Sequence, residues 1–527
     1  MRQSEAETVE GPQDGGSGRA PPRRRWRNPV MLGVAAVALV GGGTLWLSRE
    51  RIARDVIDDY LAGRGVPATY DIVSLTPQQQ VIANLVVGDP ARPDLTVRRM
   101  VIETGVGWQG PELRRVSIEG ARVFATFKGG RFSLGKLDPL VFTGSKAPPA
   151  LPAIDLVLTD ARGLLESDYG RAGFKLDGKG RIDDGFAGVL AATAPGIGTQ
   201  DCRAGSATLF GSLTTSGGAA AFDGPLRLAN LACGGASLAR ADIGTKARLT
   251  ADFAAADAGF RVTGGGLRIA DLAAAGLGGS AEIGWSKGRL AFGHDLALTG
   301  LAAPQGRLAR LVAEGDWRGA ADGSSGQWEG TLRGAGLAPA KDLAASLAAI
   351  ERGAAGTLAE PLLARARNGL GAALEGASFR GDAIIRHKGD DASLVIPEAS
   401  LASAQGTRVL ALSRVNARLG AGGVSGLAGN LLAGGEGLPS INGRIAQERG
   451  GGWSARLAMA DYAAGANRLA IPRLTLKSGS NGALSFEGLV KASGALPGGG
   501  VSDLTVPLEG TWSQRAGLAL GTRCTPL

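Results

Sequence analysis

The residues that could do chemistry in this sequence are few and widely spaced. The 527 residues include two histidines, His294 and His387, and three cysteines. Two histidines offer little for a histidine-rich zinc or iron site, and three cysteines cannot hold a four-cysteine cluster. The aspartate pairs, such as Asp183-Asp184, fall in turn-like segments where aspartate is common for conformational reasons. Neither a phosphate-binding glycine loop nor a serine-nucleophile elbow is evident. The sequence therefore predicts a protein that is not an enzyme and holds no metal or cofactor.

The cysteines suggest a structural role. Cys202 and Cys233 lie in one strand-rich stretch, and in an oxidising compartment they are candidates for a disulfide. The alternative is that both are buried thiols acting as small hydrophobic side chains. Cys524 is left over close to Leu527, where the sequence stops inside what reads as a turn. We therefore expect the chain to be the N-terminal part of a longer protein.

The N-terminal residues predict a membrane anchor. Residues 1–28 form a polar arm that ends in an arginine cluster. The uncharged run Val30–Leu47 would extend ~27 Å as a helix, close to the hydrocarbon thickness of a bilayer. We therefore expect a disordered cytoplasmic arm and a transmembrane helix over 29–48, oriented by the positive-inside rule. A cleaved signal peptide is the alternative.

A second helix is expected directly after the anchor. Residues 49–65 place Ile52, Val56 and Tyr60 on one face, and Gly63 follows where such a helix would end. This segment could rest on the membrane surface or close one end of a β structure.

From residue 66 onward the pattern has a period of two. Short apolar and polar alternations are separated by glycine, proline and Asn-Gly or Asp-Gly pairs, which is typical of strands joined by tight hairpins. The 86 glycines, about 16% of the chain, fit many hairpins and a curved sheet. We expect a mainly β fold: a long, repetitive, twisted antiparallel sheet over 66–338 and 377–527, with a small helical insertion at 339–376.

Two features refine this sheet. The segments Leu394–Leu401 and Leu469–Leu476 resemble each other, and each has a proline inside an expected strand, which suits an edge or a bulge. Chance similarity is the alternative. The cleanest alternations supply candidates for lining an apolar groove, although each could instead face a closed core. These candidates are Ile154, Leu156, Leu158, Leu484 and Phe486.

Residues 66–142 carry a family resemblance in three stretches, which read VPATYDI, NLVVGDPARPDLTV and VSIEGARVFATFKGGRFSLGKLDPL. The chain resembles the YdbH-type branch of the AsmA-like proteins, relatives of TamB in Gram-negative bacteria. The resemblance implies a twisted sheet folded into a groove with an apolar interior, and phospholipid transfer between the inner and outer membranes. It carries no catalytic residues over.

The leading hypothesis is an inner-membrane, single-pass protein whose bulk is periplasmic and conducts phospholipids along an apolar groove. Its partners would be phospholipids, the inner membrane, and outer-membrane or periplasmic proteins. The net charge of +9 brings no aromatic–basic motif, so nucleic acid is not an expected partner. The alternative is an envelope scaffold or chaperone that assists outer-membrane protein assembly by strand addition. A lower alternative is an anchored cell-wall hydrolase, which would need two facing carboxylates.

Overall fold

The computed structural model describes residues 58–59, 61–107, 110–142, 150–420, 423–448, 452–478, 483–495, 501–513 and 517–521. The expected arm, transmembrane helix and most of the juxtamembrane helix lie outside these residues. Within the described ranges, no helix combines the length and apolar character needed to cross a membrane.

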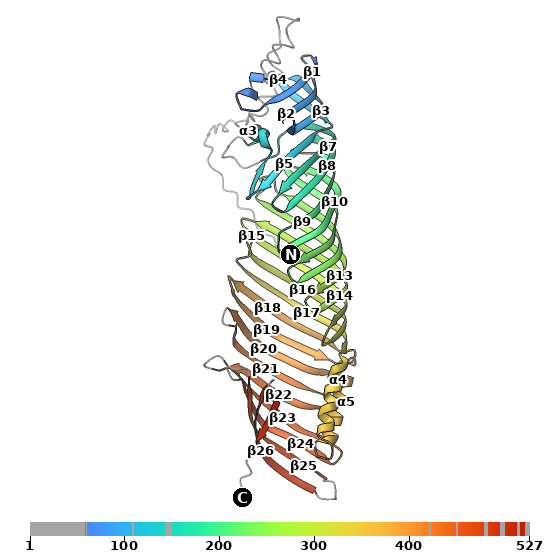
Figure 1. Cartoon of the computed structure of the whole chain (residues 1–527), viewed down its shortest axis with the longest axis vertical. Coiled ribbons are helices and arrows are strands. Elements are labelled where there is room, and N and C mark those ends of the chain that lie inside the picture. The colour runs from blue at the N-terminus through green and yellow to red at the C-terminus, as the bar shows by residue number, and fades with distance from the viewer. Residues whose placement is uncertain are drawn as a thin grey trace, which may run out of the picture.

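The described residues include one sheet of 27 strands. The strands are stacked along the long axis of the molecule, with β1 near one end and β26 near the other (Figure 1). The strands are, in chain order, β1 (Ala68–Leu75), β2 (Gln79–Asp89), β3 (Arg92–Gly107), β4 (Gly110–Glu119), β5 (Arg122–Lys128), β6 (Arg131–Ser133), β7 (Asp155–Ser167), β8 (Gly170–Arg181), β9 (Ala187–Gly198), β10 (Cys202–Ser216), β11 (Ala219–Cys233), β12 (Ala236–Leu249), β13 (Ala255–Ile269), β14 (Leu272–Ser286), β15 (Arg289–Ala303), β16 (Gly306–Ala320), β17 (Ser325–Pro339), β18 (Ser378–Lys388), β19 (Asp391–Ala402), β20 (Arg408–Gly420), β21 (Gly423–Gly435), β22 (Leu438–Gln447), β23 (Trp453–Ala464), β24 (Asn467–Ser478), β25 (Leu484–Ala495), β26 (Val501–Ser513) and β27 (Gly517–Gly521). The helices are the short 3-10 helix η1 (Gly135–Leu137), α3 (Asp138–Val141), α4 (Lys341–Gly353) and α5 (Glu360–Leu374).

Strand pairing follows chain order and is antiparallel from β7 to β27, which confirms the mainly β antiparallel prediction. The exception lies near the N-terminal end, where β4 and β5 follow one another along β7 and both run parallel to it. The hairpin turns alternate between two long edges. Edge A carries the turns after β10, β12, β14 and β16; edge B carries those after β9, β11, β13 and β15.

The two faces of this sheet differ in chemistry. Residues directly opposite each other on paired strands share a face. One row of such partners crosses the sheet from β8 to β20 without a charged residue: Gly178, Gly188, Leu213, Phe222, Ala247, Ala258, Ile283, Phe292, Trp317, Trp328, Ile385, Leu394 and Ala417. We call this side the apolar face. The opposite, polar face carries charged residues such as Asp223, Lys246 and Glu282.

From β9 to β17, one residue of each strand lies on a line across the sheet, directly opposite its counterparts on the paired strands. Each of these residues either has a positive φ or is small, and we call the line the crease. Its members alternate between residues with positive φ and small residues opposite them: Gly196, Gly205, Asn230, Ala239, Gly266, Ala275, Gly300, Ala309 and Gly336. The fit is close, because a Cβ on Gly266 would lie 2.8 Å from Ala239 Cβ. The crease therefore needs residues that accept the left-handed region and leave room for their neighbours.

The alternation between faces breaks at the crease, and the burial pattern shows which way the strands bend. In β12, Leu238 and Ala241 are 9% and 3% exposed, whereas Ala239 and Arg240 between them are both exposed. Similarly, Ala274 and Leu301 flank the crease and are buried. The apolar residues on both sides of the crease thus approach each other, while the crease itself points outward. The sheet bends toward its apolar face, which becomes the inside of a trough.

The helices α4 and α5 occupy the stretch between β17 and β18 and lie along edge B (Figure 1). Helix α5 packs on β22, β23 and β24 and buries Leu362 and Ala373. The Arg365 guanidinium donates to the Ala463 carbonyl and lies 5.5 Å from the centre of the Tyr462 ring. The Tyr462 hydroxyl in turn donates to the Gly437 carbonyl at 2.7 Å. The insertion therefore fastens neighbouring hairpin tips to each other.

Candidate functional site

The apolar face is the candidate functional site, because it is continuous and open. Trp285, Leu249 and Ile269 lie on this face and remain 37%, 36% and 46% exposed. Among the described residues, Val66 is the one large side chain less than 2% exposed. A closed sandwich would bury many large side chains this deeply. This sheet instead leaves a long apolar surface in contact with solvent.

The structure places four of the five predicted lining residues on this face, near its two ends. Leu156 and Leu158 lie on β7 and are half-buried, with Leu158 opposite Gly178 of the apolar row. Leu484 and Phe486 lie on β25, where Phe486 is opposite Leu476 and alternates with exposed Ser485.

Two further observations complete the placement. The apolar face continues from β20 to β21. Gly429 of β21 lies beside the side chain of Val415 of β20, because a Cβ built on Gly429 would lie 2.9 Å from Val415 Cγ2. Ile154 precedes β7, is half-buried, and its carbonyl accepts the Ile182 amide at 2.9 Å.

Large rings on this face lie over glycines of their own strand or of a neighbouring one. A Cβ on Gly330 would lie 2.6 Å from the Trp328 ring, and one on Gly319 would lie 2.6 Å from the Trp317 ring. The Phe379 ring covers Gly334 in the same way. A ring seated over glycine projects little into the trough, so these positions keep the inside wide. Glycine thus serves the lining as well as the turns.

His294 is a polar side chain on the apolar face, and both of its ring nitrogens are occupied. The Trp328 indole N–H donates to His294 Nε2 at 2.9 Å. Because indole is only a donor, Nε2 must accept, and Nδ1 carries the proton. Nδ1 lies 3.1 Å from the Ala313 carbonyl, to which it donates. The histidine therefore adds no unpaired polar atom to the lining.

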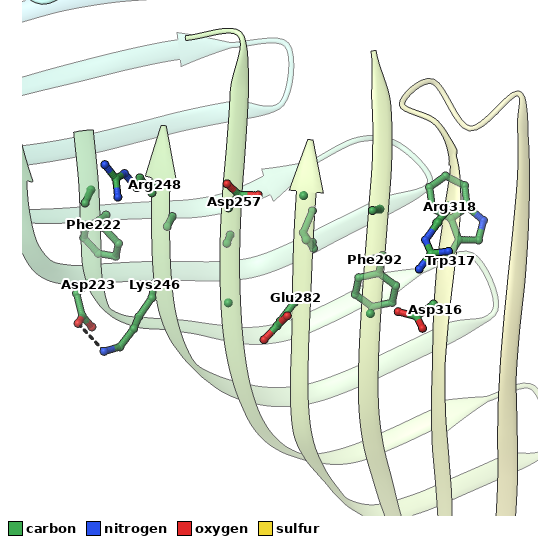
Figure 2. Close-up of a pocket in the computed structure, with 18 of the residues that line it drawn as sticks. Phe222, Asp223, Lys246, Arg248, Asp257, Glu282, Phe292, Asp316, Trp317 and Arg318 are labelled. Atoms are coloured by element: carbon green, nitrogen blue, oxygen red, sulfur yellow. Dashed lines mark ion pairs between the residues drawn. The ribbon is translucent and has the colours of Figure 1, made fainter. Parts of the chain in front are cut away.

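A hollow of about 760 Å³ opens on the polar face between β10 and β16, near edge A. Its charged lining residues carry both signs, and Figure 2 shows the Lys246–Asp223 ion pair at 3.1 Å. The same strands curve round and continue behind these side chains (Figure 2). Among the described residues, no group of three potential metal ligands gathers, here or elsewhere. Members of the apolar row also contribute to the lining of the hollow: Phe222, Ala247, Ala258, Ile283, Phe292 and Trp317.

Cys202 and Cys233 face each other at edge B, at the first residue of β10 and the last of β11. The structure joins them by a disulfide with a Cα–Cα distance of 3.9 Å. This bond closes the open end of one hairpin.

The crease bends the candidate site, and it was not predicted from the sequence. A signal was present: an apolar alternation that shifts phase at asparagine or glycine followed by an apolar residue. It occurs at Asn230-Leu231, Gly266-Leu267, Gly300-Leu301 and Gly336-Leu337, which are 34 or 36 residues apart. The repeat corresponds to one hairpin, so a period-two search alone does not reveal it.

A single long sheet, bent so that an open apolar face lines its inside and a charged face meets solvent, defines a class of protein. The apolar face is a continuous surface rather than a pocket for one small molecule. A family model described as YdbH-like, "Intermembrane phospholipid transport protein YdbH", matches residues 37–525. The chain belongs to the YdbH-like family, which confirms the resemblance noted in its sequence. No curated protein and no solved structure gives a significant match.

Proposed function

We propose that this protein is anchored in the inner membrane and carries phospholipids through the periplasm toward the outer membrane. Acyl chains would lie against the apolar face and move along it by diffusion, without a chemical step. The continuity of the apolar row from β8 to β20 carries this proposal, because hydrocarbon needs an unbroken apolar lining rather than placed polar groups. Family membership supports the same cargo. The expected anchor at residues 29–48 would hold one end at the membrane.

The proposal is tested by photocrosslinking from the two faces of one strand. A photoreactive amino acid at Phe486, on the apolar face, should crosslink phospholipid in cells. The same group at Ser485, exposed on the other face, should not. Equal labelling at the two positions would show that lipid does not select the apolar face.

A blocking substitution tests transport itself. Val262→Glu places a charge on the apolar face of β13, where an acyl chain would have to pass it at a desolvation cost. Thr263→Glu adds the same charge on the exposed face of the same strand. We expect lipid transfer between donor and acceptor vesicles to fall for Val262→Glu alone, with both variants retaining the β circular dichroism signal. Equal rates for the two variants would reject the apolar route.

A further inference from the structure

The polar face carries charges of both signs on one side of the crease and mainly arginines on the other. Toward edge A, carboxylates pair with cations across strands, as in Arg227–Asp242 at 3.0 Å and Arg333–Glu314 at 3.0 Å. Toward edge B, the strands from β10 to β17 carry exposed arginines. The carboxylates on that side are Asp201 and Asp271, and both lie in hairpin turns.

The three arginines on that side lie in one straight register line, which we call the arginine row. The line runs Arg203, Ala232, Ser237, Arg268, Ala273, Ala302, Arg307 and Ala338. An arginine thus occurs on every third strand, at steps of ~14 Å. The residues between are alanine or serine, so the guanidinium groups stand above a flat surface. In the described part of the chain, no carboxylate forms an ion pair with any of the three.

The arginine row lies at the lip of the trough. Arg203 and Arg307 are the second residues of β10 and β16, and Arg268 is the last but one of β13. An extended arginine side chain spans about the rise of two strand residues, ~7 Å, so each guanidinium can reach the rim of edge B.

The apolar lining reaches the same lip from the other side. Leu267 and Leu308 neighbour the arginines in sequence and point to the apolar face, in line with buried Leu301. At the rim, adjacent residues of one strand therefore place an apolar side chain inside the trough and a guanidinium group outside it.

We infer that the arginine row binds the phosphate groups of phospholipids whose acyl chains lie in the trough. This inference rests on the proposed function, since it takes the same cargo and adds where its headgroup goes. The guanidinium fork matches phosphate oxygens bidentately, and the amphipathic rim matches the amphipathic lipid. Steps of ~14 Å along ~29 Å of rim would let a headgroup pass from one arginine to the next.

The test compares two sets of substitutions of equal charge. Arg203→Gln, Arg268→Gln and Arg307→Gln together remove the arginine row. The control replaces Arg248, Arg261 and Arg318 by Gln, which removes three positive charges from the polar face on the edge A side. Binding of a fluorescent phosphatidylglycerol and of diacylglycerol with the same chains is measured on the full chain at low ionic strength, where surface ion pairs are least screened.

The wild type should prefer the phosphatidyl lipid, and loss of the arginine row should reduce this preference about twofold to fivefold, as expected for one exposed ion pair. The control variant should keep the wild-type preference for the phosphatidyl lipid. An unchanged preference, or an equal loss in the control, overturns the inference while leaving diacylglycerol binding as support for the trough. Failure of both lipids to bind the wild type rejects the proposed function itself. Displacement of the lipid by inorganic phosphate would also overturn the inference, by showing a free-anion site.

Discussion

The substitution Gly266→Ala tests whether the crease shapes the trough. Gly266 has a φ of +71°, and a Cβ there would lie 2.8 Å from Ala239 Cβ. The left-handed backbone costs an alanine ~1–2 kcal/mol. Overpacking against the neighbouring strand adds ~1–3 kcal/mol. We therefore expect β13 and its neighbours to lose at least ~2 kcal/mol of local stability.

The assay is amide hydrogen exchange, since each strand contacts mainly its neighbours and opening is local. A loss of ~2 kcal/mol should speed exchange in β12–β14 about 30-fold, while exchange in β23–β25 stays unchanged. Gly259→Ala is the matched control, because it lies in the same strand, has an ordinary φ, and meets nothing within 4 Å. Its exchange should not increase.

A second variant separates the two costs. Adding Ala239→Gly to Gly266→Ala removes the Cβ–Cβ contact but leaves the left-handed alanine, so part of the protection should return. If Gly266→Ala exchanges like Gly259→Ala, the left-handed backbone and the close approach to Ala239 do not constrain position 266. If the double variant exchanges like Gly266→Ala, the Cβ–Cβ contact contributes nothing to the loss of stability.

Three further predictions concern other parts of the sheet. Cys202 and Cys233 should resist alkylation until reduced, and replacing both by serine should destabilise the β10–β11 hairpin by ~3–4 kcal/mol, measured by hydrogen exchange. The Arg122 and Arg162 guanidinium groups lower the pKa of Asp160 to about 2. The stabilisation that the ionised carboxylate provides above pH ~4 should therefore fade as the pH falls toward 2, and the β5–β7 region should become easier to proteolyse. Asp160→Asn keeps a residue that accepts the left-handed backbone at this position, and it should abolish this pH dependence. Arg365→Ala should release α5 from the hairpin tips and raise exchange at β23–β24 without changing β12–β14.

The strand pattern could be predicted from the sequence because period-two alternation acts locally. Leu484 and Phe486 alternate with polar neighbours, and the structure keeps this alternation on the two faces of β25. The repeated prolines also follow the local rule: Pro472 lies within the register shift between Ala470 and Arg473, and Pro397 lies opposite Arg414, which has positive φ. Side-chain size, φ restriction and a missing N–H act within a few residues, which is why they are legible in the sequence.

The bend was not predictable in the same way, since it depends on residues far apart in the chain. The apolar phase shifts from Leu95 and Val97 to Met100 and Ile102, which predicts a bulge near Arg98 and Arg99. The structure contradicts this, because β2 and β3 keep register there. The cause of the phase shift lies on the partner strand, where Asn84 has a φ of 52° opposite Arg98. Likewise, the small size of Ala239 has meaning only beside Gly266. The arginine row depends on the register of many strands, since its members come from β10, β13 and β16. No short segment of the sequence therefore predicts it.

The strict chain-order pairing makes length and cross-section independent quantities. Each added hairpin would lengthen the sheet by ~10 Å, while the crease position within each strand sets the width of the trough. A lineage could therefore change the distance that the protein spans by duplicating or deleting single hairpins, without redesigning the lining. The distance that the sheet spans therefore changes in steps of one hairpin of 34 or 36 residues.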